Sequence, residues 1–321
     1  MSHDQHSFIF LKGIIMIYPP FLHKGDYVRL VSPAGAVNPE LVIGAVTCLS
    51  LWGLKVIKGK NVTNQKGRFS GSMVQRLSDL QEAFDDPKCK AIFCTRGGYG
   101  SIQLIDKIDL RGFKANPKWF IGYSDITMLH SLLQKEGYAS LHGGMAKVLA
   151  TQADQILTKV NSVSATQLHD ILWGNLPEYH TAAHPLNRKG RESGNLRGGN
   201  LSILYSLRGT PYDFIPAESI LFIEDIGEKP YVIDRIMYNL RLGGILKNLS
   251  GLIVGQFTDY DEDPSFGKTV YEIIADAVSD YSYPVCFNFP TGHVDLNLPL
   301  IEGAAINLEV NDSGVRVSYI E

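Results

Sequence analysis

Ser124 lies in the segment Gly122-Tyr123-Ser124-Asp125-Ile126, between a predicted strand and a predicted helix. A serine in a sharp strand-to-helix turn projects its hydroxyl outward, and the amides at the start of the helix point toward the same space. The segment keeps the first glycine and the serine of the G-x-S-x-G nucleophile elbow, but its fifth residue is isoleucine. Two interpretations of Ser124 are therefore open: it is a nucleophile, or it caps the helix, as serine often does.

Two histidines are candidates for the base that a serine nucleophile requires. His293 follows a predicted strand and the sequence Pro290-Thr291-Gly292, whereas His142 follows a short apolar run. His142 also stands closer to the serine along the chain. The local sequence favours His293 over His142 as the base, and a purely structural role stays open for both.

The base needs a carboxylate that orients it, and one predicted strand ends with two acidic residues. Glu224 and Asp225 are adjacent there, and successive strand residues point to opposite faces. Only one of them can therefore face a given site. Glu228 is a third candidate. The alternative is a surface acidic pair, or a carboxylate that interacts with the helix predicted to begin at Pro230.

Residues 96–100, Arg96-Gly97-Gly98-Tyr99-Gly100, follow another predicted strand, and we call them the glycine loop. Consecutive glycines let a backbone approach a ligand closely with its amides turned inward. The loop could supply an oxyanion-hole donor or cradle a phosphate, although no Walker or G-x-G-x-x-G pattern is present. Arg96 would suit a substrate carboxylate through bidentate pairing, and a structural salt bridge is the alternative.

Composition narrows the function classes. Among the 321 residues, 30 basic against 33 acidic ones give a net charge of -3, so nucleic acid is not an expected partner. The four cysteines, at 48, 89, 94 and 286, form no C-x-x-C and have no histidine at metal-binding spacing. We therefore expect no metal and no cofactor. Scattered reduced cysteines also favour a cytoplasmic protein.

The N-terminal stretch from Phe8 to Ile17 is apolar but is interrupted by Lys12 and Gly13. It lacks the basic start and the cleavage site of a signal peptide, so we expect that it is not one. No stretch approaches the roughly 20 apolar residues of a membrane span, and we expect no membrane partner.

The elements that must position these residues alternate between strands and helices in the first half. Strands are predicted at 27–31, 55–57, 91–95 and 119–122, and helices at 40–52, 75–84 and about 126–135. Alternation of this kind predicts an α/β fold in which helices flank a mostly parallel sheet.

The second half of the sequence has a different pattern of predicted strands and helices. Strands are predicted at 219–223, 252–255 and 285–287, with helices at 201–207 and 230–242, and the last twenty residues alternate as strands around a turn at 311–314. The polar segment from 152 to 193 has little regular pattern. We predict an N-terminal α/β domain at 19–160, a connecting segment at 161–194, and a second domain at 195–321, for which the family resemblance described next implies a smaller, β-rich fold.

Taken together, the segments resemble the LD-carboxypeptidase family, the S66 serine peptidases, from about Pro19 to Gly314. Each segment alone is weak evidence for the family, but the order and spacing of the segments are specific to it. The segments are Lys24 to Ala34, Arg96 to Gly100, Gly122 to Asp125, Leu141 to Met145, Gly198 to Leu201, Phe222 to Asp225, and Gly292-His293 with Asn297 and Pro299.

The resemblance implies a Ser-Glu-His triad, carried onto Ser124, Glu224 and His293, which decides against His142. It implies that the backbone amides of Gly98 and Asp125 form the oxyanion hole. The serine would come from the first domain, and the glutamate and histidine from the second. Family members are commonly homodimers.

The resemblance also implies the reaction. A serine carboxypeptidase of this kind hydrolyses an L,D-peptide bond, here that of a murein tetrapeptide, and releases D-alanine in cell-wall recycling. Arg96, Gly97 and Tyr99 would bind the substrate. One alternative is a microcin C-type peptide-nucleotide hydrolase, which would stack the nucleotide on aromatics of the connecting segment, where Trp173 is the single tryptophan. Another is a non-enzymatic α/β binding protein in which Ser124 is a cap.

Overall fold

The computed structural model describes residues 8–11, 14–158 and 162–320 of the chain, which form two compact units. The first unit takes in Ile14–Leu176 and Leu298–Ile301, and the second takes in Pro177–Asn297 and the residues from Glu302 onward. The domain limits that the sequence predicts, 19–160, 161–194 and 195–321, are not tested by this division and stay predictions. Within the described ranges, no helix combines the length and the apolar character that crossing a membrane demands.

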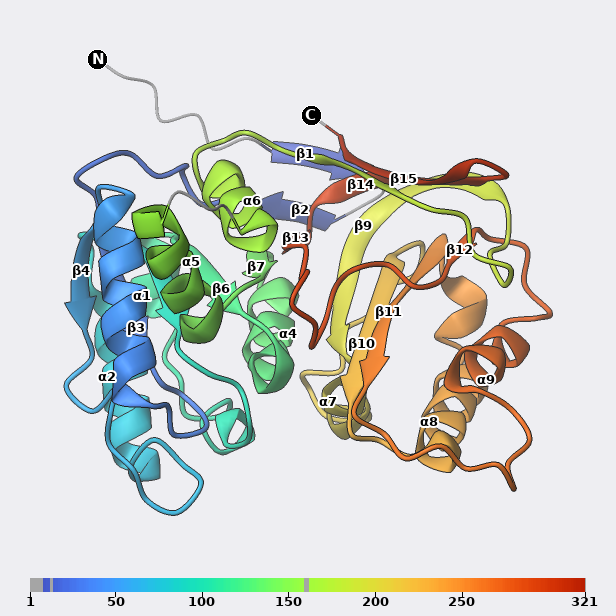
Figure 1. Cartoon of the computed structure of the whole chain (residues 1–321), viewed down its shortest axis with the longest axis horizontal. Helices are drawn as coiled ribbons and strands as arrows, with labels where there is room; N and C mark the ends of the chain where they lie inside the picture. Colours follow the sequence, from blue (N-terminus) through green and yellow to red (C-terminus); the bar gives the residue numbers. More distant parts are fainter. Residues whose placement is uncertain (1–7, 12–13, 159–161, 321) are drawn as a thin grey trace. The chain divides into compact units, whose positions relative to one another are not determined.

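A six-stranded sheet forms the centre of the first unit (Figure 1). Its order is β13-β7-β6-β5-β3-β4, and every pair from β7 to β4 is parallel. The strands are β3 (Tyr27–Val31), β4 (Lys55–Lys58), β5 (Cys89–Cys94), β6 (Trp119–Gly122), β7 (Ser140–His142) and β13 (Leu300–Glu302). All four residues of β6 are buried, as expected of a strand covered on both faces.

Helices flank this sheet, as the sequence predicts. They are α1 (Pro39–Leu51), α2 (Met73–Asp85), α3 (Arg111–Ala115), α4 (Thr127–Lys135), α5 (Ala146–Thr158) and α6 (Val163–Leu172). Phe84 of α2, Phe113 of α3 and Leu129 of α4 share a core with Phe120 of β6. On α2, Ser72 and Gln75 form a capping box, which satisfies amides at the start of the helix. The helices α1 and α5 lie side by side in Figure 1.

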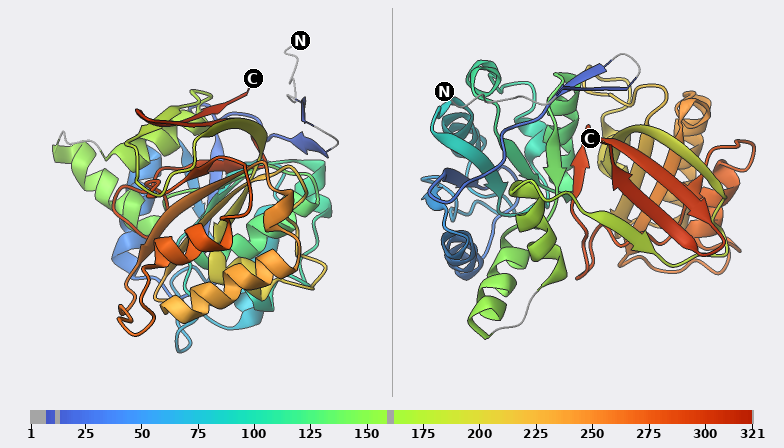
Figure 2. Two further views of the ribbon diagram at one scale, coloured as in Figure 1. Left: turned by 90° about the vertical axis from the view of Figure 1, so that its right-hand side faces the viewer. Right: turned by 90° about the horizontal axis from the view of Figure 1, so that it is seen from above.

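A seven-stranded mixed sheet forms the second unit, in the order β12-β11-β10-β9-β14-β15-β8. The strands from β12 to β9 are parallel, and those from β9 to β8 are antiparallel; Figure 2 shows this sheet from two sides. The strands are β8 (Glu178–Thr181), β9 (Gly190–Asn200), β10 (Ile220–Ile226), β11 (Gly251–Thr258), β12 (Val285–Cys286), β14 (Ala305–Asn311) and β15 (Gly314–Tyr319).

Three helices pack on the parallel part of this sheet: α7 (Leu201–Ser206), α8 (Pro230–Leu242) and α9 (Val270–Ala277). Ile233 and Ile236 of α8 share a core with Ile274 of α9 and with Leu221 and Val254 of the sheet. Burying apolar side chains of this size stabilises the fold by about 1.5–3 kcal/mol each. The predicted fold class, a helix-flanked parallel sheet plus a β-rich second part, is therefore confirmed.

Some elements differ from the sequence-based expectation. The segment 152–193, predicted to have little regular structure, contains α6, β8 and parts of α5 and β9. The glycine-rich stretch 194–200, for which no strand was predicted, lies inside β9. A β-carbon on Gly198 would lie 1.9 Å from the carbonyl oxygen of Phe222, so glycine lets β9 approach β10 closely. Near the N-terminus, β1 (Phe8–Leu11) and β2 (Ile14–Ile17) form a two-stranded sheet.

Candidate active site

Ser124 follows β6 and begins a short 3-10 helix, η2 (Ser124–Ile126), that leads into α4. Its φ angle is 65°, in the left-handed region that residues with a β-carbon rarely adopt. Such a conformation costs about 1–3 kcal/mol and persists only where the surroundings impose it. Neither N-cap position here, Tyr123 for η2 and Ile126 for α4, makes a side-chain cap hydrogen bond. Ser124, which is half-buried, therefore does not cap the helix, and its left-handed turn needs another explanation.

The glycine loop packs directly against this turn. A β-carbon on Gly97 would lie 2.7 Å from the Ser124 β-carbon and 2.9 Å from its hydroxyl oxygen, so no larger residue fits. The carbonyl of Gly97 accepts a hydrogen bond from the amide of Gly35 at 2.9 Å. Gly98 has a φ angle of 92°, which glycine adopts without strain. The loop and the turn thus fit together without intervening side chains.

The two amides expected to form an oxyanion hole are both available. Neither the amide of Gly98 nor that of Asp125 donates a hydrogen bond to another residue in the described part of the chain. Backbone amides without an acceptor are costly unless water or a ligand satisfies them. Each one lies at the end of a parallel strand, where open α/β sheets place their ligand sites.

His130 of α4 holds the strand that ends before Ser124, a role that the sequence did not suggest. Its Nε2 lies 2.9 Å from the carbonyl oxygen of Gly122, and its Nδ1 lies 2.8 Å from the hydroxyl of Ser140. A carbonyl only accepts, so Nε2 carries the proton and Nδ1 accepts from the serine. Complete burial lowers the pKa of His130 to about 4, so it is neutral at pH 7. A histidine at a buried helix position was the available signal, but its partners become visible only in the fold.

In the second unit, Glu224 and His293 are hydrogen-bonded to each other. Nδ1 of His293 lies 2.7 Å from Oε2 of Glu224, whose side chain is fully buried on β10. A carboxylate only accepts, so Nδ1 carries the proton, and in this neutral tautomer Nε2 is the acceptor nitrogen. A β-carbon on Gly292 would lie 2.9 Å from Oε2, so glycine permits this approach. The side-chain oxygen of Asn297 accepts the amide of Gly292 at 2.9 Å and steadies the loop.

The pKa of His293 is raised above its usual 6.5. Burial by itself lowers this pKa, but the hydrogen bond that His293 donates to Glu224 and the charge of Glu224 outweigh it, with smaller contributions from Asp225 and Asp259. A nearby negative charge favours the imidazolium form. The pair is therefore suited to receive a proton and to stabilise the resulting positive charge.

Asp225, the neighbour of Glu224, points to the other side of β10 and binds the start of α7. Its carboxylate accepts the amide of Ser202 at 2.8 Å, the hydroxyl of Ser202 at 2.7 Å and the side-chain amide of Asn200 at 3.1 Å. Burial raises the pKa of Asp225 to about 6. Adjacent strand residues point to opposite faces, so Glu224 binds the histidine while Asp225 binds the start of α7.

His142, the other candidate base, ends β7 in the first unit and is fully buried. Its ring packs on that of Tyr123 with centroids 5.6 Å apart. Arg96 is exposed, and one of its guanidinium nitrogens donates to the carbonyl of Ala36 at 2.6 Å. It forms no ion pair with any residue that the structure describes, so the salt-bridge interpretation is not supported. Tyr99 is 44% exposed and packs beside Phe69.

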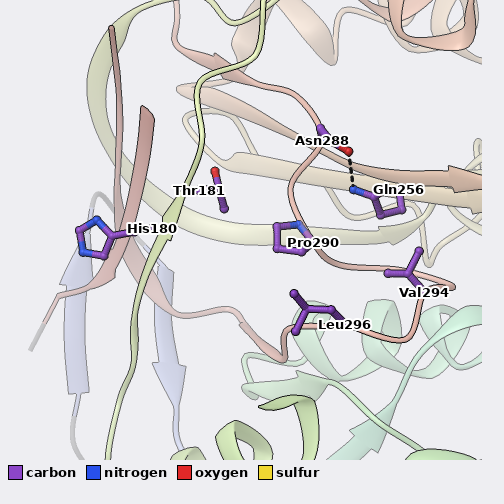
Figure 3. Close-up of a pocket in the computed structure, with 7 residues that line it drawn as sticks. All are labelled: His180, Thr181, Gln256, Asn288, Pro290, Val294 and Leu296. Atoms are coloured by element: carbon purple, nitrogen blue, oxygen red, sulfur yellow. Dashed lines mark hydrogen bonds between the residues drawn. The ribbon is translucent and has the colours of Figure 1, made fainter. Parts of the chain in front are cut away.

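A hollow of about 390 Å³ adjoins the loop that carries His293 (Figure 3). Across it, the side-chain amide of Gln256 donates to Asn288 at 2.9 Å. It is lined by His180, Thr181, Gln256, Asn288, Pro290, Val294 and Leu296. The lining contains no carboxylate. Elsewhere among the described residues, no three His, Cys, Asp or Glu side chains gather as metal ligands.

Comparison with known proteins finds the same architecture. Residues 28–143 match the LD-carboxypeptidase N-terminal domain, and residues 193–308 match the LD-carboxypeptidase C-terminal domain. A Bacillus subtilis protein named "Probable murein peptide carboxypeptidase" is 34% identical over 92% of this chain and 94% of its own length. The murein tetrapeptide carboxypeptidase of Pseudomonas aeruginosa is 30% identical over 88% of this chain and 93% of its own.

Solved structures agree. The muramoyltetrapeptide carboxypeptidase of Oxalobacter formigenes superposes with a TM-score of 0.81 at 25% identity, covering 92% of this chain and 99% of that one. A microcin C7 self-immunity protein shares the fold, with a TM-score of 0.81 at 21% identity. The two matched domains and the relatives that span nearly the whole chain lead to one conclusion: the chain belongs to the LD-carboxypeptidase family of S66 peptidases.

Proposed function

We propose that this chain is a serine carboxypeptidase that hydrolyses an L,D-peptide bond and releases a C-terminal D-amino acid. The proposed substrate is a murein tetrapeptide that loses its terminal D-alanine in cell-wall recycling. The observation that carries the proposal is the strained Ser124, with the free amides of Gly98 and Asp125 at neighbouring strand ends. The names of the P. aeruginosa and O. formigenes relatives, a murein tetrapeptide carboxypeptidase and a muramoyltetrapeptide carboxypeptidase, support the choice of substrate.

The proposed mechanism is acyl transfer in two steps. Nε2 of His293 takes the proton of Ser124 as its oxygen attacks the carbonyl carbon, and Glu224 holds the imidazole and stabilises its charged form. The amides of Gly98 and Asp125 donate to the oxyanion, and each such donor contributes roughly 3–4 kcal/mol in known cases. His293 then passes the proton to the departing amine of the D-residue. Water, activated by the same histidine, hydrolyses the acyl-enzyme and restores Ser124.

Recognition of the D-residue needs a cation for its free carboxylate. Arg96 is exposed at the start of the glycine loop and forms no ion pair with the residues described. We therefore assign it to that carboxylate, with Gly97 and Tyr99 as further substrate contacts. Its bond to Ala36 fixes one nitrogen and leaves the rest of the guanidinium fork for a bidentate contact.

Replacing Ser124 by alanine tests the nucleophile. D-alanine release from an L-Ala-γ-D-Glu-diaminopimelate-D-Ala tetrapeptide should fall by at least about 10⁴-fold, because removal of a triad member leaves only the oxyanion hole and binding. Product analysis by chromatography measures the release. The wild type, but not the variant, should also react covalently with a fluorophosphonate. Equal D-alanine release from both proteins would refute the assignment, and would leave a binding protein as the better description.

The substrate itself is tested by a direct comparison. We expect turnover of the tetrapeptide and none of an aminoacyl sulfamoyl-adenosine, the compound that a microcin C-type hydrolase would cleave. Trp173, the tryptophan that such an activity could use for stacking, is already stacked on His169 at 4.1 Å and contacts Trp52 edge-on. Turnover of the adenosine compound alone would overturn the murein assignment.

We also propose that the enzyme works in the cytoplasm. All four cysteines are buried and none forms a disulfide. Burial raises the pKa of Cys48 and of Cys286 to about 12, so these thiols stay protonated and inert. Structural thiols of this kind are typical of proteins in reducing compartments.

A further inference from the structure

Two charged side chains, Arg76 and Asp125, are buried beneath the glycine loop although the proposed chemistry uses neither. Arg76 lies in the first turns of α2 and is 2% exposed, and Asp125 directly follows Ser124 and is 1% exposed. Burial lowers the pKa of Arg76, which Asp125 partly offsets, and it raises the pKa of Asp125. Burying charges is expensive unless they are paired and hydrogen-bonded, so their contacts need a reason.

Asp125 connects the nucleophile turn to the far end of the glycine loop. Its Oδ2 accepts the amide of Ser101 at 2.8 Å, and Ser101 is the residue that follows the loop. The backbone of Asp125 carries one proposed oxyanion donor, while its side chain fixes the segment that carries the other. One residue therefore links both donors.

Arg76 also fixes this end of the loop, through hydrogen bonds of its guanidinium group. One guanidinium nitrogen donates to the carbonyl of Gly100 at 2.9 Å and to that of Pro33 at 2.6 Å. The other terminal nitrogen donates to the side-chain oxygen of Gln103 at 2.6 Å. A β-carbon on Gly100 would lie 2.7 Å from the arginine, so the loop is shaped to receive it.

The segment held between these anchors has little stiffness of its own. Gly98 and Gly100 have φ angles of 92° and 138°, and glycine visits many alternative conformations. The start of the loop is fixed by the bond from Gly35 to Gly97, and its end by Arg76 and Asp125. Gly98, whose amide is the proposed donor, lies between the two anchored ends.

We propose that the carboxylate of Asp125 and the guanidinium of Arg76 are positioning groups that fix the amide of Gly98 relative to the amide of Asp125. The inference rests on the proposed function and assigns the two groups a task within it. They touch no reacting atom. They set the orientation of a donor that matters most when negative charge develops, so their loss should appear in kcat rather than in KM.

The test compares Asp125→Ala with Asp125→Asn. Alanine leaves the amide of Ser101 without its acceptor, and a donor misplaced by about 1 Å can cost roughly 10²-fold in rate. We expect kcat for D-alanine release and the rate of fluorophosphonate labelling to fall by about that factor, with KM changed less than about threefold. Asparagine keeps an acceptor for Ser101, so it should restore both rates to within about tenfold of the wild type.

Arg76→Lys tests the second positioning group, and Lys118→Met is the control for a loss of stability. A lysine at 76 keeps the charge but not the planar fork, and it should lower the same two rates. Lys118 is also buried and basic, but it donates to the carbonyls of Phe84 and Asp86 at the other end of α2. Lys118→Met should lower the unfolding temperature without changing kcat. This variant separates a loss of stability from a loss of positioning.

Three results would overturn the inference: a kcat for Asp125→Ala within about threefold of the wild type, a loss confined to KM, or an equal loss in Lys118→Met. Failure of the proposed function has a different signature. A wild type that is labelled but does not cleave the tetrapeptide has another substrate, and the labelling rates still test the positioning groups. A wild type that does neither refutes the proposed nucleophile, and the positioning role with it.

Discussion

The hydrogen bond between Glu224 and His293 assigns separate tasks to the two nitrogens of one imidazole. Nδ1 is committed to the carboxylate, so the tautomer that leaves Nε2 as the acceptor is favoured before any substrate binds. The pKa of His293 is raised above 6.5, and in the proposed mechanism the imidazolium form cannot take the serine proton. If His293 is the base, as we propose, Glu224 therefore both orients it and sets the pH at which it works.

Glu224→Gln should change both the pH midpoint and the maximum of kcat/KM. Below its pKa, His293 is protonated and cannot take the serine proton, so kcat/KM of the wild type rises with pH through a midpoint above 6.5. Without the charge of Glu224 this midpoint should move to lower pH. The maximum should fall by roughly 10³–10⁴-fold, since glutamine no longer fixes the tautomer.

The pH profile of kcat/KM for D-alanine release measures both effects. The matched control is Glu262→Gln, an exposed glutamate of the same unit, which should leave midpoint and maximum unchanged. An unchanged midpoint in Glu224→Gln would mean that this carboxylate does not set the pKa of the working base.

At the level of single residues, the sequence indicated candidate site residues such as Ser124 but not their local geometry. It could not decide between a cap and a nucleophile for Ser124, because the φ angle of 65° depends on packing by distant residues such as Gly97. The roles of His130 and Arg76 were not predicted either. His130 and Arg76 fix this region by donating to the backbone carbonyls of Gly122 and Gly100, and such acceptors have no signature in the sequence.

At the level of elements, the contact between the glycine loop and the nucleophile turn depends on a missing side chain. Gly97→Ala would place a β-carbon 2.7 Å from that of Ser124, and either the loop or the turn must shift. We expect kcat for D-alanine release to fall by roughly 10²-fold, because the hydroxyl and the oxyanion donors lose their alignment.

Steady-state kinetics beside thermal unfolding measures this effect. Gly143→Ala is the matched control, since its β-carbon would meet neighbours no closer than 3.4 Å, an ordinary contact distance. It should keep near wild-type kcat. Equal activity of both variants would contradict the tight contact at Gly97.

Elements with a strong local signal were predicted well. The helix 230–242 has the predicted bounds, with Pro230 at its first position and Gly243 directly after it. Strand β9 was missed because Gly198 and Gly199 favour a turn on propensity alone, whereas tertiary packing against Phe222 requires them in a strand. Helix α6 was missed because a polar segment surrounds its buried positions, Ala165, Leu168 and Ile171.

For the whole molecule, the family resemblance predicts a homodimer. The surface of α8 exposes Tyr231, Tyr238 and Leu242, the last to 84%, and association of subunits buries apolar surface of this kind. Sedimentation equilibrium at micromolar concentration should give twice the mass of the chain, with dissociation on dilution. A single-chain mass at every concentration would contradict this prediction.

Strand β13 has a consequence for how the protein is made. It supplies the strand next to β7 in the first sheet, yet its residues follow the second unit up to Asn297 along the chain. During synthesis the N-terminal half emerges first, so β7 remains an open edge until residues 300–302 of β13 leave the ribosome. An unpaired edge can pair with another nascent chain. The first unit cannot complete its sheet during translation of its own half, and a gene fragment ending at Leu176 would encode an unfinished sheet.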